Sequence, residues 1–437
     1  MDSPSRSSDL LDALSALVRA NDTAGVGALL ARHPGLTVEL DAPLPGYGFG
    51  GTALLAAVHH GNREMVDLLL QAGADINARS HWWAGSFGVL DDDGGLAPFL
   101  IERGARIDVH AASRLGMVDR LQALIATDPA LVHARGGDGQ TPLHFAASIE
   151  IAGFLLDRGA DIDARDVDHE STPVQWMIRE RQPVARYLVS RGCRTDILMA
   201  AALGDLELVR GHLDAEPESI NISVSDRYFP RRDHRSGGSI YIWTLGQYKT
   251  AHLVAREFGH DEAYRFLMER SPDELKLVVA CQAGDEAMVG TLLANRPDLG
   301  LTLSPDERRK VADAAQGNSL PAVRLMLAAG WPPDARGQHG ATPLHWAAWH
   351  GNAEMVGELL RHHPPLDAAD NDYNGSPLGW AMHGSENSWH KETGDYAATV
   401  EALLRAGAKS LDSKTGHGTP AAREALRRYG RYERGAS

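Results

Sequence analysis

The sequence lacks the features that would place the protein in a membrane, outside the cell or on nucleic acid. No run of eighteen apolar residues occurs among its 437 residues, so no segment is expected to span a bilayer. Cys193 and Cys281 are its only cysteines, too few for a disulfide framework, which predicts a reducing cytoplasm. The formal net charge of −15 argues against nucleic-acid binding, because phosphate contacts need a basic surface.

The chain also lacks a secretion signal and the known sequence signatures of active sites. Asp9, Asp12 and Arg19 interrupt the first apolar stretch at helical spacing, so we expect an amphipathic helix there and no signal peptide. No P-loop, nucleophile elbow or Cys/His zinc spacing is present. We therefore expect no metal and no cofactor.

What the sequence does contain is a repeated unit. Clear copies are GTALLAAVHHGNREMVDLLLQAGADINA at 51–78, QTPLHFAASIEIAGFLLDRGADIDA at 140–164 and ATPLHWAAWHGNAEMVGELLRHHPPLDA at 341–368. A fourth begins STPVQWM at Ser171. The Thr-Pro pair suits the start of a helix, the alanine pair lets helices approach closely, and the leucines form an apolar stripe. No unit can bury its own apolar face, so the pattern predicts stacking of neighbours.

These units resemble the ankyrin repeat. The resemblance implies an all-α solenoid of about twelve helix–turn–helix units over almost the whole chain, because looser copies fill the intervals between the clear ones. The C-terminal segment TPAAREALRRYGRYERG is polar and basic, as expected of a helix that caps the last repeat. The looser copies lie at 10–34, 110–129, 198–217, 250–270, 277–297 and 311–330.

Three segments depart from the repeat. We expect a shortened first helix in 80–95, a two-stranded β-ribbon with a Gly-Gly turn in 220–248, and a loop inserted between two helices at 384–396. The ribbon would separate an N-terminal sub-array, 1–218, from a C-terminal sub-array, 249–437, with the ribbon insertion itself at 219–248.

Binding residues follow from the resemblance. In ankyrin repeats, partners generally lie against the hairpin tips and the exposed end of the first helix. These are the positions just before the Thr of TPLH, and positions eight and nine when that Thr is counted as position one. These positions also include Glu257 and Phe258. Together with aromatic residues of the interruptions, the predicted ligand-binding set is Tyr47, Phe49, His59, His60, Trp82, Trp83, Trp243, Tyr248, His339, Trp349, His350, Asp372, Tyr373 and Trp389.

This set supports two hypotheses that the sequence leaves open. In the first, the protein recognises a partner protein on its concave face, with the aromatic residues as anchors. In the second, the inserted segments roof a pocket lined by His, Asp and Trp for a small polar molecule such as a carbohydrate, and the protein binds it or acts as an acid–base enzyme. Either function suits a monomer. The candidate catalytic residues are Asp91, Asp92, Asp168, His169, His383 and His390.

Other conspicuous residues are predicted to be structural. Trp176, Trp346 and Trp380 share the fifth repeat position, beside the packed alanines, and are expected to be partly buried. Residues 370–375 copy the first half of an EF-hand loop, but position twelve is Ala381, where a bidentate Glu is required. This segment is interpreted as a hairpin tip.

Overall fold

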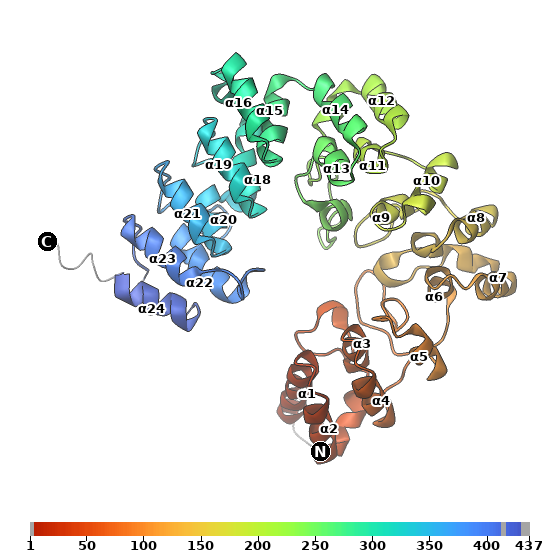
Figure 1. The fold of residues 1–437 in the computed structure, drawn as a ribbon. Coiled ribbons are helices and arrows are strands. Elements are labelled where there is room, and N and C mark those ends of the chain that lie inside the picture. Colours follow the sequence, from red (N-terminus) through yellow and green to blue (C-terminus); the bar gives the residue numbers. More distant parts are fainter. Residues whose placement is uncertain (1–3, 412–416, 430–437) are drawn as a thin grey trace. The chain divides into compact units, whose positions relative to one another are not determined.

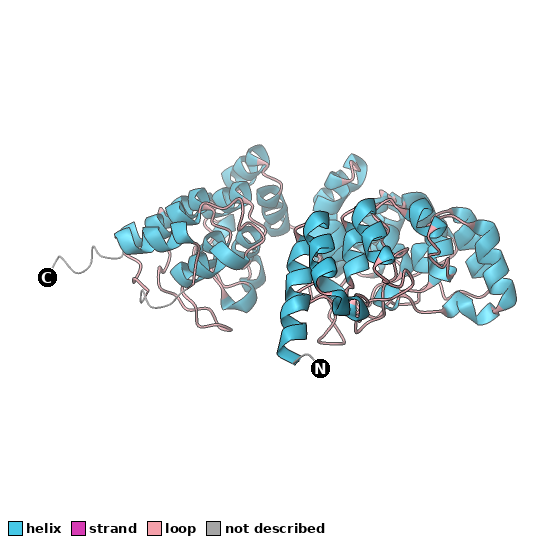
Figure 2. Ribbon diagram, turned by 90° about the horizontal axis from the view of Figure 1, so that it is seen from below, coloured by secondary structure: helices cyan, strands magenta, loops and turns pink. Residues whose placement is uncertain are grey.

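The computed structural model describes residues 4–411 and 417–429 and is built from helices and loops, with no extended strand in these ranges (Figure 2). The expectation of an all-α fold is therefore confirmed. The chain divides into two compact units, Met1–Val209 with Ser223–Gln247, and Arg210–Ile222 with Tyr248–Ser437. No described helix is long and apolar enough to cross a membrane.

The first unit begins with the expected N-terminal helix and continues as pairs of short helices (Figure 1). Helix α12 lies across the division between the units. The helices are α1 (Pro4–Arg19), α2 (Thr23–Arg32), α3 (Ala53–His59), α4 (Arg63–Gln71), α5 (Ala97–Glu102), α6 (Val109–Arg114), α7 (Val118–Thr127), α8 (Ile149–Asp157), α9 (Pro173–Met177), α10 (Gln182–Ser190), α11 (Ile197–Leu203) and α12 (Leu206–Ala215).

The second unit repeats the same arrangement. Its helices are α13 (Ala251–Glu257), α14 (Asp261–Arg270), α15 (Asp273–Gln282), α16 (Glu286–Asn295), α17 (Pro305–Arg308), α18 (Lys310–Gln316), α19 (Leu320–Ala328), α20 (Pro343–Trp349), α21 (Ala353–Leu360), α22 (Pro377–Asn387), α23 (Tyr396–Arg405) and α24 (Pro420–Tyr429).

Residues close in sequence cap the first helix of a repeat, and one of them also contacts the next repeat. At α20 the Thr342 N–H donates to His345 Nδ1 at 3.1 Å, which closes a capping box. The other ring nitrogen of His345 donates to the Gly375 carbonyl of the following hairpin at 3.1 Å. His144 makes the same pair of contacts with Thr141 and the Ser171 carbonyl. The histidine of TPLH therefore ties neighbouring repeats together.

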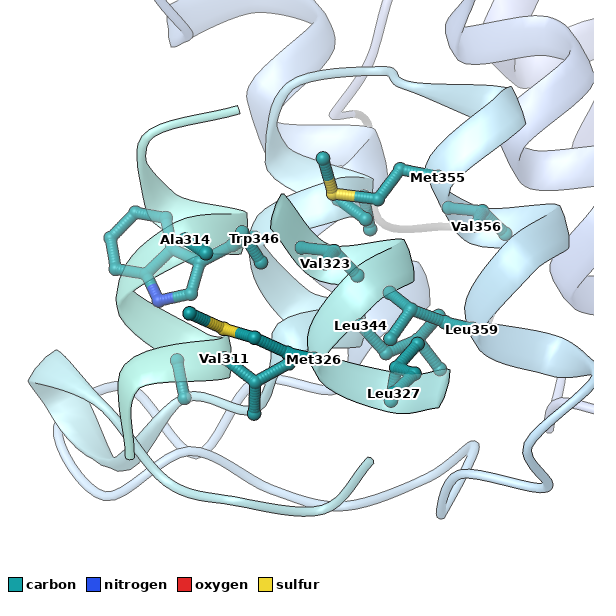
Figure 3. Close-up of a cluster of buried hydrophobic side chains, with 14 of the residues drawn as sticks. Val311, Ala314, Val323, Met326, Leu327, Leu344, Trp346, Met355, Val356 and Leu359 are labelled. Atoms are coloured by element: carbon teal, nitrogen blue, oxygen red, sulfur yellow. The ribbon is translucent and has the colours of Figure 1, made fainter. Parts of the chain in front are cut away.

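In the second unit two layers of helices stack. Helices α18, α20 and α22 pack in sequence in one layer, and α19, α21 and α23 pack in the other. Figure 3 shows the side chains between the layers, where Met326, Leu344 and Leu359 are fully buried. Each such side chain contributes about 1.5–3 kcal/mol by leaving water. The predicted cap is present, because α24 packs on α22 and α23 and buries Leu426.

The three interruptions differ from the expectations. Residues 81–96 contain no helix, so the first helix of that repeat is absent and α5 alone follows. The predicted β-ribbon is wrong: 220–248 holds the end of a 3₁₀ turn, loops and a single π-turn at Ile242–Gly246. Buried and exposed residues alternate along this run of turns, as they would along a strand: Tyr241 is fully buried and Trp243 is exposed. In 384–396, the first residues extend α22 to Asn387 before the loop begins.

Candidate functional site

The predicted site residues fall into groups in each of the two units. In the first unit, Phe49, at a hairpin tip, contacts the loop 80–95: its ring lies 4.9 Å from that of Trp82. The ring of Trp83 is 6.1 Å from Trp82 and supports the guanidinium of Arg235, 4.3 Å above it. The tryptophan pair thus packs between a hairpin tip and the segment 223–247.

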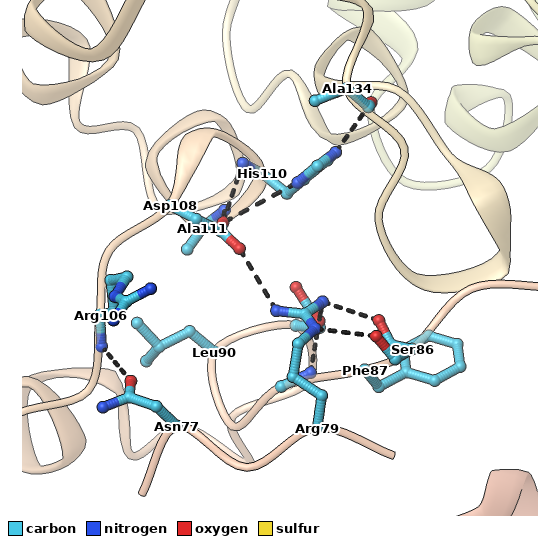
Figure 4. Close-up of polar contacts among 12 residues, drawn as sticks. Asn77, Arg79, Ser86, Phe87, Leu90, Arg106, Asp108, His110, Ala111 and Ala134 are labelled. Atoms are coloured by element: carbon cyan, nitrogen blue, oxygen red, sulfur yellow. Dashed lines mark hydrogen bonds and ion pairs between the residues drawn. The ribbon is translucent and has the colours of Figure 1, made fainter. Parts of the chain in front are cut away.

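Two predicted acids have different environments. Asp91 accepts hydrogen bonds from Arg79 at 2.9 Å and from the Gly88 N–H at 2.6 Å. Burial raises the pKa of Asp91, and the nearby Arg79 opposes this rise. In Figure 4, Arg79 lies between Ser86 of the loop and Asp108 at the start of α6. Asp91 therefore helps to hold the loop 80–95 in its conformation.

Asp92 is exposed and lies beside the end of α3. Its carboxylate is 3.8 Å from Nε2 of His59, whose Nδ1 is 2.8 Å from the Tyr47 hydroxyl. Burial, with a smaller effect from the charge of Asp92, raises the pKa of Tyr47. His60 is exposed, as expected. The structure therefore brings Tyr47, His59 and Asp92 together as one polar surface.

A third group joins Asp168 and His169 with Asp138, which was not predicted. One ligand atom from each of the three side chains lies within 4.8 Å of the other two. His169 Nε2 is 3.6 Å from Asp168 Oδ2. The Trp82 indole N–H donates to Asp138 at 3.0 Å. Burial raises the pKa of Asp138 to about 6, which His169 opposes and the charges of Asp168 and Asp166 reinforce.

Asp138 could have been found from the sequence. It lies three residues before Thr141, as Phe49 lies three before Thr52 and His339 three before Thr342. All three tip residues adopt a left-handed backbone, with φ of 53°, 58° and 59°. The rule that selected Phe49 and His339 selects Asp138 as well.

Beside this group, the segment 223–247 covers a cleft of about 140 Å³. Its wall includes Arg165, Arg231 and Arg232, together with Tyr228 and Ser239. This volume is below the range of about 300–1,000 Å³ usual for small-molecule sites. Arg231 and Arg232 of the segment 223–247 therefore line part of this cleft.

In the second unit the hairpin tips carry a His–Asp pair and an exposed aromatic ring. His339 Nδ1 is 2.6 Å from Asp372 Oδ2, and its ring lies 5.5 Å from that of Tyr373. Asp370 holds this tip, because its carboxylate accepts hydrogen bonds from the backbone N–H of Asp372, Tyr373 and Gly375. Tyr373 remains 69% exposed.

The inserted segment lies over the ends of α20 and α22. The ring of Trp389 is 6.3 Å from that of Trp349 and 5.9 Å from that of His350, yet Trp389 is 73% exposed. His390 lies 5.0 Å from the His350 ring. His383 is exposed, with its ring 5.7 Å from Trp349. Predicted residues of α20, α22 and the insertion therefore form one continuous surface.

Two residues expected to bind ligand are core residues. His350 is 2% exposed, its Nε2 donates to the Gln316 carbonyl at 2.8 Å, and burial lowers its pKa to about 4. Its place at the helix end falls under the insertion, which the repeat pattern could not show. Tyr248 is 7% exposed, and its hydroxyl donates to Gln316 Oε1 at 3.0 Å. Glu257 lies beside Lys249, with which it forms an ion pair.

Of the tryptophans at the fifth repeat position, Trp176 is partly buried, as expected, whereas Trp346 and Trp380 are buried. The indole N–H of Trp380 donates to Asp370 at 2.9 Å, and that of Trp176 donates to Asp166 at 2.7 Å. Each of the two hairpins therefore contains an internal carboxylate, and this carboxylate connects the tip to the helix that follows it.

Comparison with known proteins agrees with this architecture. The family model described as Ankyrin repeats (3 copies) matches residues 109–199, 277–372 and 311–409, and the one described as Ankyrin repeat matches residues 49–81. The chain is similar to the E3 ubiquitin-protein ligase XB3 of Oryza sativa subsp. japonica, with 36% identity over 93 residues, 21% of each chain. It is also similar to the E3 ubiquitin-protein ligase KEG of Arabidopsis thaliana, with 24% identity over 261 residues, 58% of this chain and 14% of that protein. The aligned regions thus span only 21% and 14% of the two relatives.

Proposed function

This chain belongs to the ankyrin-repeat family, whose repeats recognise proteins, and we propose that it binds a partner protein through the hairpin tips and the insertion of its second unit. We define the docking surface as His339, Asp372, Tyr373, His383 and Trp389. The observation that carries the proposal is the exposure of Tyr373 and Trp389, 69% and 73%, on elements whose positions are set by buried contacts behind them.

The support for these two residues comes from their environment. Tyr373 sits on a tip held by the Asp370 carboxylate, and Trp389 rests its ring against Trp349 and His350. An aromatic side chain that is already held in place loses little conformational entropy when it binds. Exposed tryptophan and tyrosine are the residues most often found at the energetic centres of protein interfaces.

The charge of the surface indicates the kind of partner. Asp372 is exposed and pairs with His339, while the chain as a whole carries −15. A partner segment with an apolar or aromatic anchor and a basic residue would match this surface. A complementary charge would also speed association at low salt.

A small polar ligand remains the less favoured function. The four predicted catalytic residues of the first unit do not assemble into one site: Asp91 supports a loop, Asp92 pairs with His59, and Asp168 with His169 forms a separate group. Beside that group the segment 223–247 borders two hollows. One is a cleft of about 140 Å³, which is small for an organic ligand. The other, of about 690 Å³ and lined by Arg165, Glu170 and Arg232, is wide open to solvent and does not enclose a ligand. Protein recognition therefore accounts better for the exposed aromatic residues.

The test is site-specific photocrosslinking followed by affinity measurement. A photoreactive phenylalanine analogue placed at Tyr373 or Trp389 of the full chain should capture one protein in an extract of the source cells. The same analogue at Leu301, which is 71% exposed in the 3₁₀ turn between α16 and α17, should not. With the captured protein purified, Tyr373→Ala and Trp389→Ala should each weaken binding at least tenfold, and Leu301→Ala should leave it unchanged. Equal capture from all three positions would reject the docking surface.

We also propose that the protein acts as a cytoplasmic monomer. Cys193 and Cys281 are both free thiols in buried positions, as expected where disulfides do not form. Light scattering of the purified chain should give the mass of a single copy across concentrations. A mass that doubles with concentration would reject the monomer.

A further inference from the structure

The buried acids of the first unit carry more negative charge than the surrounding residues balance. Asp138, Asp166 and Asp168 are 8%, 3% and 4% exposed, respectively. Among the described residues, no lysine or arginine forms an ion pair with any of the three, and His169 is the single basic side chain in contact. Because an uncompensated buried carboxylate costs several kcal/mol, such a group normally holds extra protons or a cation.

Asp166 differs from the other two acids. Its carboxylate accepts hydrogen bonds from the backbone N–H of His169 and of Ser171 and from the indole of Trp176. Asp370 has the same role in the second unit. Asp166 is therefore a structural acid of the hairpin, and its oxygens are in use.

Asp138, Asp168 and His169 are each fixed on one side and meet on the other. The Trp82 indole donates to Asp138 Oδ1, and the Gly237 N–H donates to Asp168 Oδ1 at 3.2 Å. The Gly238 carbonyl lies 2.9 Å from His169 Nδ1. A carbonyl only accepts, so Nδ1 carries the hydrogen and neutral His169 turns the lone pair of Nε2 toward Asp168 Oδ2, 3.6 Å away.

This arrangement places two electron-pair donors opposite each other. A metal-bound histidine typically donates its second ring N–H to a backbone carbonyl or a carboxylate, and metal-bound carboxylates are held in turn by further hydrogen bonds. The three ligand atoms lie within 4.8 Å of one another. Bonds of about 2.1 Å to one ion place ligand atoms about 3 to 4.2 Å apart, which small side-chain rotations would achieve here.

We propose that Asp138, Asp168 and His169 form a binding site for a divalent transition-metal ion, with Zn²⁺ as the first candidate. One imidazole nitrogen and two carboxylate oxygens suit Zn²⁺ or Mn²⁺ better than Ca²⁺ or Mg²⁺, which prefer oxygen alone. The three protein ligands leave a further position for water. This site replaces the expectation of a chain without a metal, and it is independent of the docking surface, whose residues belong to the other unit.

The ion would join three parts of the chain. Asp138 and Asp168 come from consecutive hairpin tips, and the backbone at Gly237 and Gly238 holds Asp168 and His169 from the segment 223–247. The Ser236 hydroxyl also donates to the Asp168 carbonyl. Binding of the ion would therefore hold this segment against the repeats, including the exposed arginines 231, 232 and 235.

The direct test is metal binding by the full chain after chelator treatment and dialysis. Titration calorimetry with Zn²⁺ should show one ion per chain with a Kd below about 10 μM, a binding free energy of about −7 kcal/mol. Asp138→Asn and His169→Gln should each weaken binding at least 100-fold. His339→Gln with Asp372→Asn removes an exposed His–Asp pair of the second unit and should leave the tight site intact. Co²⁺ in place of Zn²⁺ should give a visible absorption spectrum that the two site variants lose.

Two further measurements keep the outcome decisive if a site variant folds poorly. Trp82→Phe keeps the ring and removes the hydrogen bond to Asp138, so it should weaken binding about 10- to 100-fold. In the unaltered chain, Zn²⁺ should slow trypsin cleavage at the arginines 231, 232 and 235, and a chelator should restore it. No binding tighter than 1 mM, or equal loss in the His339/Asp372 variant, would show that protons alone neutralise the cluster and would overturn the proposal.

Discussion

Replacing Asp370 by Ala tests how the docking surface is held. The carboxylate is 4% exposed and accepts four hydrogen bonds: two at Oδ1, from the N–H groups of Asp372 and Tyr373, and two at Oδ2, from Gly375 and the Trp380 indole. Burial alone would raise the pKa of Asp370, but these bonds lower it below its usual value. The ionised form is therefore the one that organises the tip.

The magnitude follows from the four donors. Each hydrogen bond to a charged group is worth about 1.5–3 kcal/mol, and a buried donor left without a partner costs about 1–3 kcal/mol. Water can reach the N–H groups of Asp372 and Tyr373, which are exposed, but reaches the buried Trp380 indole poorly. We expect Asp370→Ala to lower the free energy of unfolding by about 3–5 kcal/mol, less than the sum because the four bonds act together.

The assay is urea unfolding of the full chain, followed by tryptophan fluorescence, with hydrogen exchange to locate the change. Amides 371–375 should lose protection in Asp370→Ala. The variant Asp370→Ala/Trp380→Phe has no indole N–H left without an acceptor. It should therefore recover about 1–2 kcal/mol of the lost free energy of unfolding. The matched control Asp372→Ala removes an exposed acid and should cost under about 1 kcal/mol. A loss below 1 kcal/mol for Asp370→Ala, or no coupling with Trp380, would refute the reasoning.

Three further predictions concern the folded state. His350 has a folded pKa of about 4, so the unfolded chain takes up its proton first, near pH 6.5. The free energy of unfolding should therefore fall by up to about 3 kcal/mol as pH drops from 6.5 to 4, and His350→Gln should flatten this slope in urea titrations. Gly85→Ala would place a Cβ 2.2 Å from the Gly136 carbonyl oxygen at φ 137°, so it should displace the loop 80–95 and lower the melting temperature; an unchanged temperature would contradict the close approach. Leu344→Ala, in the core, should cost about 2–5 kcal/mol in urea unfolding, whereas Leu301→Ala should cost under about 0.5 kcal/mol.

The candidate site was predicted in part, and the failures have a common cause. Counting positions from the Thr of TPLH correctly placed Tyr373 and His339 at exposed or half-exposed tips, because contacts inside one repeat set these positions. It was wrong for His350, where an insertion 40 residues further along the chain covers the helix end. The alternation in 220–248 suggested strands because a run of turns can alternate buried and exposed residues as a strand does.

The sequence by itself determined the repeat, the helix pairs and the residues that cap and stack them. Those features depend on contacts within about one repeat length, such as the capping box of Thr342 and His345, and the residues that make them recur in each copy of the repeat. Only the tertiary structure decided which polar residues meet. Asp138 and Asp168 are one repeat apart, and the segment 236–238 that orients His169 lies almost 70 residues further on. No local pattern encodes such a meeting, because stacking and the path of an irregular segment create it.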